Sequence, residues 1–255
     1  VPVVILVHGS GPSNMDEAMG PNAPFRDLAE GLSRRGVAVL RYDKRTFVCP
    51  QFFENAKEGY TYDDETVDDA ISAVRLVKDS LAKEKTIDPS RIYVVGHSMG
   101  GMLAPRIAQR SGEVAGLVLL AAPTGKLRPT MERQLAYLGR SAEEVRQLTD
   151  LALAEIPEVY LDMDARYSDT ATAQNLNIPM LILQGERDYQ VTMDDYRTWR
   201  EAVGSRQGVV MKSYPSLNHL FMTGKGGSMP EEYQTPGHVA EEVMDDIANF
   251  VLLGK

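Results

Sequence analysis

Apolar residues follow two alternating patterns along the chain, short strand-like runs and helical spacings. The runs are rich in Val, Ile and Leu, as is typical of strands that are buried on both faces of a parallel sheet. They cover residues 3–7, 37–40, 91–95, 114–120, 179–183 and 208–213. Between the runs, apolar side chains recur at helical spacing, as at Phe25, Leu28 and Leu32. This alternation predicts an α/β fold with a doubly wound, mostly parallel sheet.

One stretch interrupts the alternation. Residues 124–176 carry apolar side chains without a strand pattern, and Ser141 with Glu144 forms a capping box that predicts the start of a helix. We expect a helical cap, or lid, inserted above one edge of the sheet, with ordinary helices that complete the fold as the alternative. No internal repeat or linker marks a second domain, so residues 1–255 are predicted to form a single domain.

Composition narrows the choice of partners and compartment. The net charge is −9, and an acidic surface repels phosphate backbones, which argues against a nucleic-acid partner. No apolar run approaches the roughly 20 residues that a membrane-spanning helix needs. The single cysteine, Cys49, cannot form an internal disulfide, which favours a soluble, cytoplasmic protein, and we expect it to be a structural or pocket-wall residue. Because the chain starts at Val1, we expect a trimmed product, and an upstream signal peptide remains open.

The most specific motif is a Gly-x-Ser-x-Gly turn at residues 96–100, which read Gly-His-Ser-Met-Gly. The turn lies between the apolar run at 91–95 and a helical spacing that begins at Met99. A sharp turn from strand to helix strains the backbone at the serine, and the flanking glycines leave room for it. The turn would lift the Ser98 hydroxyl out of the sheet at the positive end of the next helix. A glycine-rich packing turn is the alternative interpretation.

A serine nucleophile needs a base, and the chain offers four histidines. His8 ends the first strand, and His97 lies inside the turn with its side chain expected to point away from that of Ser98. His238 opens the last predicted helix, where capping or exposure to solvent explains it. His219 follows the last strand in a short loop, from which a side chain can reach back over the sheet. We therefore predict His219, ahead of His238, as the general base.

The acid that orients this base should follow the preceding strand at the same edge of the sheet. Asp188 does so, and Glu186, nearer the strand, is the second candidate. With Asp188 in this role, the order along the chain is serine, acid, histidine. That order is expected of one hydrolase fold and differs from the two other common orders.

An oxyanion hole is the third requirement, because N–H donors must face the oxygen that becomes negative during the reaction. The amide of Met99, directly after the serine, is one candidate. The amide of Ser10 is the second, because the loop at 9–11 follows the first strand, which should neighbour the strand before the turn. Only backbone groups are required at these two positions.

These features together resemble the α/β-hydrolase superfamily, and within it carboxylesterases that are grouped with serine aminopeptidase-like and bile-acid acyltransferase-like sequences. The matching stretches extend along almost the whole chain, at residues 8–12, 42–45, 96–100, 185–188 and 218–219. The resemblance implies the α/β-hydrolase fold, with Ser98 as nucleophile, His219 as base and Asp188 as its partner. It also implies the Ser10 and Met99 amides as oxyanion donors, no metal and no organic cofactor.

The chain departs from this family in one respect. Family members usually carry further strands before the first apolar run, and these are absent here. In the family's strand order, Val37–Leu40 then forms an edge of the sheet, and an exposed apolar edge invites pairing. We expect a homo-oligomer or a missing N-terminal segment to cover this edge.

The leading interpretation is a carboxylesterase that cleaves small or medium-sized esters through a covalent acyl-enzyme. Its apolar pocket is predicted to contain Phe221, Met222, Met131 and Leu138. An aminopeptidase is one alternative, but it needs an anionic group for a free amino terminus, and no single acid stands out in the sequence. A thioesterase or acyltransferase is another. A non-catalytic binding module of the same fold belongs to a different class, and such modules usually lose a member of the triad.

Overall fold

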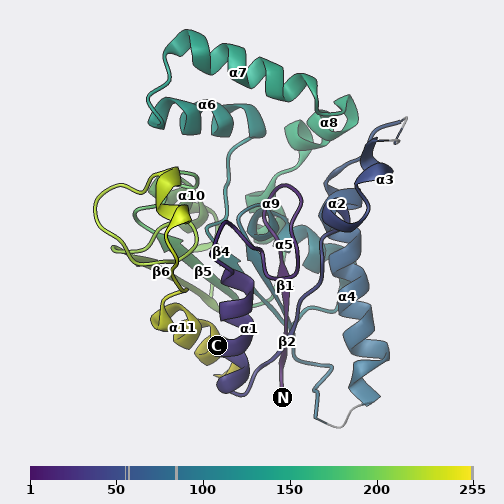
Figure 1. The fold of residues 1–255 in the computed structure, drawn as a ribbon. Helices are drawn as coiled ribbons and strands as arrows, with labels where there is room; N and C mark the ends of the chain where they lie inside the picture. Colours follow the sequence, from purple (N-terminus) through teal and green to yellow (C-terminus); the bar gives the residue numbers. More distant parts are fainter. Residues whose placement is uncertain (55, 57, 84–85, 254–255) are drawn as a thin grey trace.

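A six-stranded parallel sheet forms the centre of the computed structural model, which describes residues 1–54, 56, 58–83 and 86–253 (Figure 1). Its strands are β1 (Val3–Val7), β2 (Ala38–Leu40), β3 (Ile92–His97), β4 (Gly116–Leu120), β5 (Met180–Gly185) and β6 (Val209–Tyr214). They lie in the order β2-β1-β3-β4-β5-β6, and all neighbouring pairs are parallel. The predicted doubly wound parallel sheet is therefore confirmed.

Helices connect these strands and cover both faces of the sheet (Figure 1). They are α1 (Pro24–Arg34), α2 (Arg45–Val48), α3 (Pro50–Glu54), α4 (Asp68–Asp79), α5 (Met99–Ser111), α6 (Leu127–Tyr137), α7 (Ala142–Ala154), α8 (Glu158–Arg166), α9 (Asp169–Gln174), α10 (Met193–Val203) and α11 (Glu241–Leu253). Helices α1 and α11 pack on one face of the sheet, whereas α4, α5 and α10 pack on the other.

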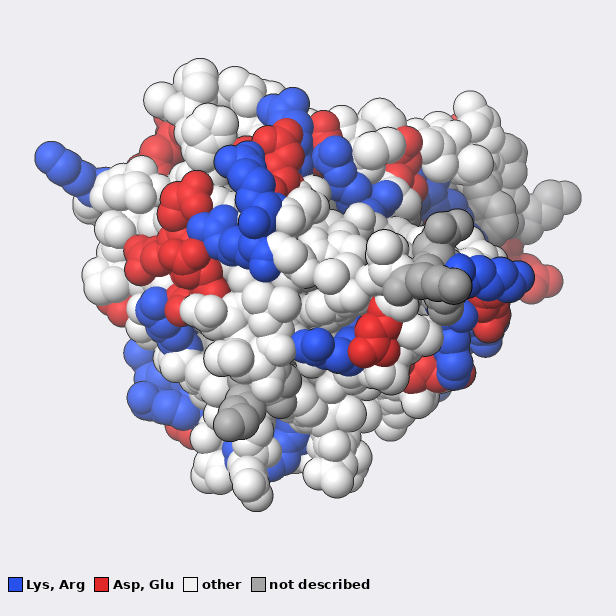
Figure 2. Space-filling view, turned by 90° about the horizontal axis from the view of Figure 1, so that it is seen from below, with Lys and Arg blue, Asp and Glu red and all other residues white. Residues whose placement is uncertain are grey.

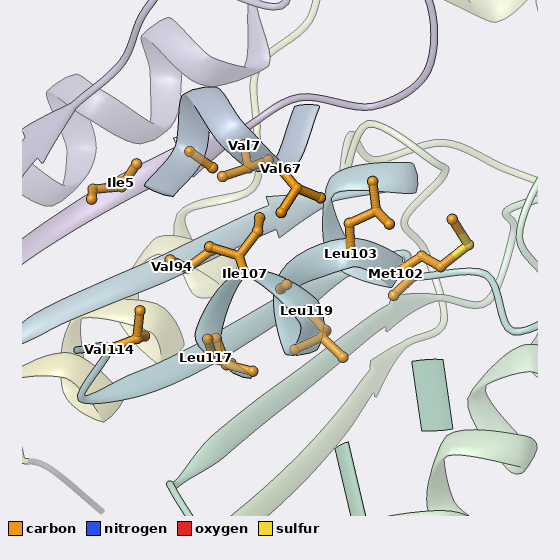
Figure 3. Close-up of a cluster of buried hydrophobic side chains, with 14 of the residues drawn as sticks. Ile5, Val7, Val67, Val94, Met102, Leu103, Ile107, Val114, Leu117 and Leu119 are labelled. Atoms are coloured by element: carbon orange, nitrogen blue, oxygen red, sulfur yellow. The ribbon is translucent and has the colours of Figure 1, made fainter. Parts of the chain in front are cut away.

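The core is divided into two layers because alternate residues of each strand point to opposite faces. In β1, Ile5 and Val7 belong to the apolar cluster that includes α4 and α5, while Val4 and Leu6 belong to the cluster that includes α1 and α11. Figure 3 shows the first layer, in which strand residues face Leu103 and its neighbours on α5. Burial on both faces explains why β1, β3, β4 and β5 read as apolar runs, whereas the edge strands β2 and β6 are mostly half-buried.

Helices α6, α7 and α8 lie beyond the carboxyl ends of the strands, at the top of Figure 1. They belong to residues 124–176, for which the sequence predicts helices without strands. The last helix of this stretch, α9, lies instead against α5 and α10, and its Ala173 is fully buried in the core beside the sheet. Helix α9 therefore belongs with the helices that cover the sheet, and a cap formed by the preceding helices remains a prediction.

Strand β2 is the edge of the sheet next to β1, as the sequence predicts, and its side chains are half-buried. Whether a second copy or a further segment covers this edge stays a prediction. No helix within the described ranges is long and apolar enough to cross a bilayer. On the face of the molecule seen in Figure 2, basic and acidic side chains lie intermixed.

Candidate active site

Ser98 lies at the turn between β3 and α5 in a strained backbone conformation. Its φ of 52° and ψ of −120° fall outside the regions that residues other than glycine usually adopt. Its amide donates to the carbonyl oxygen of Leu120 at 2.8 Å, which ties the turn to β4. Because α5 begins at Met99, the serine is placed at the positive end of a helix.

Glycine is needed on both sides of this serine because the backbone packs too closely for a Cβ. A Cβ at Gly96 would lie 2.1 Å from the carbonyl oxygen of Gly100. A Cβ at Gly100 would lie 2.2 Å from the carbonyl oxygen of Val7 in β1. Both distances are far shorter than any contact that a Cβ tolerates, so the turn can be formed only with glycine at these two positions.

Asp188 and His219 form a short, buried polar contact on the loops that follow β5 and β6. His219 Nδ1 lies 2.6 Å from Asp188 Oδ2, and the two side chains are 4% and 0% exposed. The second carboxylate oxygen, Oδ1, accepts hydrogen bonds from the amides of Gln190 and Val191 at 2.8 and 3.0 Å. Because an ionised carboxylate can only accept, the imidazole proton is placed on Nδ1, and Nε2 is left with a lone pair.

The other candidates for these two roles lie elsewhere. Glu186 is exposed, and its Oε1 accepts a hydrogen bond from the hydroxyl of Ser213 at 2.7 Å. The side chain of His238 is 85% exposed, and its Nδ1 lies 3.1 Å from Asp27 Oδ1. The structure therefore brings neither of them to the buried acid–histidine pair.

The backbone of His219 lies against the turn that carries Ser98. The Nε2 atom of His97, the residue before the serine, lies 2.9 Å from the carbonyl oxygen of His219. The rings of the two histidines have centroids 4.7 Å apart. Among the described residues, none forms a hydrogen bond with the Ser98 hydroxyl. The pairing of Ser98 with His219 therefore stays a prediction, although the two residues lie in the same neighbourhood.

A second buried pair of an acid and a histidine lies behind this turn. Glu17 Oε2 is 2.9 Å from His97 Nδ1, an ion-pair contact rather than an aligned hydrogen bond. Burial disfavours the charge on both side chains, but their mutual attraction, together with hydrogen bonds to the Gly9 amide and the His219 carbonyl oxygen, outweighs it. The pKa of His97 is therefore raised and that of Glu17 is lowered. The sequence gives no signal for Glu17, because it lies beside Asp16 in a loop without periodic pattern.

The two amides that were predicted to form the oxyanion hole belong to residues in the wall of one cavity with Ser98. Neither the Ser10 amide nor the Met99 amide has a hydrogen-bond partner among the described residues. The loop before Ser10 is close to the serine, since a Cβ at Gly9 would lie 3.2 Å from that of Ser98. Unpaired amides beside a hydroxyl group are available to a ligand, and their role as oxyanion donors stays a prediction.

This cavity has a volume of about 300 Å³. Its walls come from the serine turn, from α6 and α8, and from the loop after β5. Apolar side chains of Met99, Met102, Leu127 and Val191 form much of the surface. Among the described residues that line it, Asp164 carries the one charged side chain. The cavity therefore suits a largely apolar ligand of modest size.

The structure places one of the four predicted pocket residues in this wall. Met131 lines the cavity, and its contact with a substrate stays a prediction. Phe221 is only 2% exposed and packs in the core between the sheet and α1 and α11. Met222 and Leu138 pack together in a separate apolar cluster. None of these three side chains lies in the wall of the cavity that contains Ser98. For Phe221 and Met222 the reason is a reversal of the chain at Phe221, whose φ is 57°, after which the Met222 amide donates to the Asn218 side chain. Leu138 follows the end of α6 and packs against the cluster of Met222.

A second cavity of about 370 Å³ adjoins the first. The two share Ser10, Leu127 and Tyr160, so they meet beside the predicted oxyanion loop. Cys49 is exposed and lies in the wall of neither cavity. The expectation that this cysteine is a structural or pocket-wall residue is therefore wrong; it follows a short helix, α2, that lies at the surface.

Sequence reasoning missed a buried lysine that contacts the loop around Ser10. Lys44 Nζ lies 2.9 Å from the carbonyl oxygen of Gly9 and 2.6 Å from Glu65 Oε1. The other oxygen of Glu65 accepts a hydrogen bond from the hydroxyl of Tyr160 at 2.7 Å. Burial and this carboxylate raise the pKa of Tyr160, so its hydroxyl stays protonated and donates. The sequence marks Lys44 only as part of a stretch that resembles the family.

The polar groups in the wall of the cavity are hydroxyls, amides and one carboxylate. Within the described part of the chain, no group of three or more His, Cys, Asp or Glu side chains is arranged to hold a metal ion. The polar groups of the cavity are therefore suited to hydrogen bonding with a small organic ligand.

Comparison with known families agrees with this fold. A model of the alpha/beta hydrolase family matches residues 4–245. The chain belongs to the alpha/beta hydrolase family. The chain is 41% identical to Esterase EstD from Thermotoga maritima over 266 aligned positions, which cover 98% of the chain and 62% of EstD. The chain therefore spans about three fifths of the length of this curated relative.

Solved structures resemble this chain in fold. The Pyrococcus furiosus esterase Pf2001 has a TM-score of 0.62 at 22% identity, with 86% of this chain and 74% of that chain covered. Est1E from Butyrivibrio proteoclasticus has a TM-score of 0.58 at 16% identity, with 99% and 88% covered. At these identities the likeness concerns the fold alone.

Proposed function

We propose that this hydrolase is a serine carboxylesterase that cleaves small to medium-sized esters through a covalent acyl-enzyme. Ser98 is the nucleophile, His219 is the general base, and Asp188 orients the imidazole. The amides of Ser10 and Met99 stabilise the oxyanion.

The observation that carries this proposal is the buried 2.6 Å contact between His219 and Asp188. The carbonyl oxygen of this histidine lies 2.9 Å from the ring of His97, the residue before Ser98. An imidazole that gives Nδ1 to a carboxylate can use only Nε2 as a base. The positive φ of Ser98 further supports a nucleophile at this turn. The similarity to EstD, a protein named as an esterase, supports the choice of an ester as substrate.

In the first half of the reaction, Ser98 Oγ attacks the carbonyl carbon of the ester while its proton passes to Nε2 of His219. The carbonyl oxygen becomes negative and accepts hydrogen bonds from the amides of Ser10 and Met99. When the tetrahedral intermediate collapses, the bond to the alcohol oxygen breaks and His219 returns the proton to it. The alcohol leaves, and the acyl group stays bound to Ser98.

In the second half, water takes the place of the alcohol. His219 removes a proton from the water, whose oxygen attacks the acyl carbon and forms a second oxyanion in the same hole. Collapse of this intermediate breaks the bond to Ser98 Oγ, which recovers its proton from His219. The products are a carboxylic acid and an alcohol, and the enzyme is unchanged.

The carboxylate of Asp164 supports a second candidate class of substrates, those that carry an amino group. Its two oxygens accept hydrogen bonds from the Tyr62 hydroxyl at 2.8 Å and from the Leu127 amide at 3.1 Å. A carboxylate can accept about four hydrogen bonds, so it has capacity for a cationic amine. The sequence offered no single acid for such a group, whereas this carboxylate belongs to the wall of the cavity beside Ser98. Aminoacyl esters or short peptides are the corresponding substrates.

A fluorophosphonate probe, which reacts with activated serines, tests the proposal. We expect the native protein to be labelled on Ser98, with complete loss of labelling and of ester hydrolysis in Ser98→Ala. A folded native protein that is neither labelled nor active on nitrophenyl esters would overturn the proposal and favour a non-catalytic binding module. A matched control is Ser72→Ala on the exposed face of α4, which should be labelled normally.

A substrate panel separates the two candidate classes. We expect nitrophenyl esters of short and medium acyl chains to be hydrolysed with higher kcat/KM than aminoacyl anilides. The reverse order would show a peptidase. Asp164→Asn should lower kcat/KM for aminoacyl esters only, if the carboxylate binds their ammonium group.

A further inference from the structure

Lys44 brings a positive charge into the interior beside the predicted oxyanion loop, and no step of the proposed reaction uses it. Its side chain is 2% exposed, and that of its partner Glu65 is 7% exposed. A buried ion pair is weak evidence for stability, because well-packed apolar side chains of similar volume often stabilise a fold equally well. The location of this pair therefore points to a role at the site.

The ammonium group of Lys44 has three donors, and three acceptors surround it. These are the carbonyl oxygens of Gly9 at 2.9 Å and Gly11 at 3.1 Å, and Glu65 Oε1 at 2.6 Å. The backbone amide of Lys44 also donates to the carbonyl oxygen of Ser13 at 2.9 Å. One residue thus fixes three carbonyl groups of the loop that contains Ser10.

The contact with Gly9 determines where the Ser10 amide points. The Gly9 carbonyl and the Ser10 N–H belong to the same peptide unit, which is planar, and in a trans peptide the two groups point in opposite directions. Because Lys44 holds the oxygen on the buried side, the N–H is directed away from Lys44. Ser10 lies in the wall of the cavity that contains Ser98, and its amide has no partner among the described residues.

The preceding peptide unit is fixed from the other side by an anion. Glu17 Oε1 accepts a hydrogen bond from the Gly9 amide at 2.7 Å. A buried carboxylate and a buried ammonium therefore hold the two peptide units that flank Gly9. A glycine can rotate about both of its backbone dihedrals with little steric cost, so these contacts supply the rigidity that its side chain does not.

We propose that Lys44 is a positioning residue that holds the Ser10 N–H in the orientation needed to stabilise the oxyanion. This inference rests on the proposed esterase function. The positive charge also polarises the peptide unit, which strengthens the N–H as a donor. Through Glu65 the same set of contacts reaches Tyr160 on α8, in the wall of both cavities. The orientation of the oxyanion donor is thereby linked to the position of that helix.

The double variant Lys44→Met/Glu65→Gln tests this role, because it removes the lysine contacts without leaving an unpaired buried charge. An oxyanion donor acts in the transition state, so kcat should fall about tenfold or more while KM stays within about threefold. Affinity for an alkyl boronic acid, which forms a tetrahedral adduct with the serine, should fall by a similar factor. The matched control is Lys78→Met, which removes an exposed lysine paired with Glu113 and should leave both values unchanged.

The reference for this experiment is ester hydrolysis by the native protein, which should be lost in Ser98→Ala. If the native protein does not hydrolyse esters, the result contradicts the proposed esterase function and not the role of Lys44. A folded double variant with native kcat and native boronate affinity would overturn the positioning role. If the double variant does not fold, the single variant Lys44→Met decides the question. It removes the contacts with the Gly9 and Gly11 carbonyl oxygens, so kcat and boronate affinity should fall about tenfold or more while KM stays within about threefold, and a folded single variant with native kcat would overturn the positioning role.

Discussion

The Nδ1 atom of His219 and the Oδ2 atom of Asp188 lie 2.6 Å apart, although the residues are 31 positions apart in the chain. They follow β6 and β5, which are neighbours in the sheet, so their loops leave the sheet side by side. Two backbone amides hold the other carboxylate oxygen, so the acid cannot turn away from the imidazole. The sheet thereby fixes both the tautomer and the direction of the proposed base.

Replacing Asp188 with Asn should lower kcat by about 10⁴-fold while the fold is kept. An amide at this position can still accept hydrogen bonds from the Gln190 and Val191 amides through its oxygen. Its NH₂ group would then face His219 and favour the tautomer with the proton on Nε2, which cannot act as a base. Steady-state kinetics and a thermal melt of the purified variant measure the two effects.

Glu186→Gln is the matched control, because Glu186 was the second candidate for the orienting acid. This side chain is exposed and bonded to the Ser213 hydroxyl. We expect its kcat to stay within about twofold of the native value. A large loss in this variant, together with near-native turnover in Asp188→Asn, would exchange the roles of the two acids.

The sequence was sufficient for the sheet and for expecting Asp188 and His219 to be partners, because strand patterns and the loops that follow neighbouring strands are local features. The pairing of Ser98 with His219 stays a prediction. Strands buried on both faces read as apolar runs, and the loops after consecutive strands carry the polar residues of the site. The serine turn was predictable for a related reason. Glycine is required at Gly96 and Gly100, because a Cβ at either position would collide with backbone atoms, and this requirement makes the motif recognisable in the sequence.

The supporting charges could not be predicted, because they depend on how irregular loops fold. Lys44 reaches the Gly9 carbonyl oxygen from the loop after β2, and Glu17 reaches the Gly9 amide from further along the loop that follows β1; neither lies in a periodic pattern. The position of Phe221 could not be predicted for a similar reason. Phe221 directly follows the loop of His219, but a reversal of the chain with positive φ turns its side chain into the core. Proximity in sequence did not imply proximity to the cavity.

The buried pair of Glu17 and His97 should make stability depend on pH. The pKa of His97 is raised above its ordinary 6.5, so its contribution is complete below about pH 6.5 and is lost as the pH rises through the raised value. The pKa of Glu17 is lowered from 4.5, so its contribution is complete above about pH 4.5 and is lost as the pH falls. The pair should therefore stabilise the fold most between these two pH values.

Glu17→Gln measures this contribution by urea unfolding at about pH 6 and about pH 9. The variant should be destabilised at both, because Gly9 loses a charged acceptor, and the loss in free energy of unfolding should be larger at pH 6. The ring of His97 also faces that of His219, and Asp188 adds to the raised pKa, so Asp188→Asn is the control for their influence. An equal loss at both pH values would mean that Glu17 and His97 are not both charged.

Gly100→Ala should destabilise the protein by about 3 kcal/mol, because the added Cβ would lie 2.2 Å from the Val7 carbonyl oxygen and the turn must move away from β1. Activity should fall as well, since the same movement displaces Ser98. Gly237→Ala is the control. Its added Cβ would meet the flexible Sδ of Met222 at 3.2 Å, so the cost should stay within about 1 kcal/mol. Similar losses in the two variants, measured by urea unfolding, would argue against a specific backbone contact at the turn.

Met131→Trp should change the preferred length of the acyl chain. Met131 lies in the wall of the cavity beside Ser98, so a larger side chain takes space from the substrate. The ratio of kcat/KM for nitrophenyl octanoate to that for nitrophenyl acetate should fall about tenfold, since poor fit of a few methylenes costs that much in a shaped pocket.

Leu138→Ala is the control, because Leu138 packs against the cluster of Met222 and lies outside the cavity wall. It should lower the melting temperature and leave the ratio unchanged. A changed ratio in Leu138→Ala with none in Met131→Trp would place the acyl chain beside the apolar cluster that contains Met222.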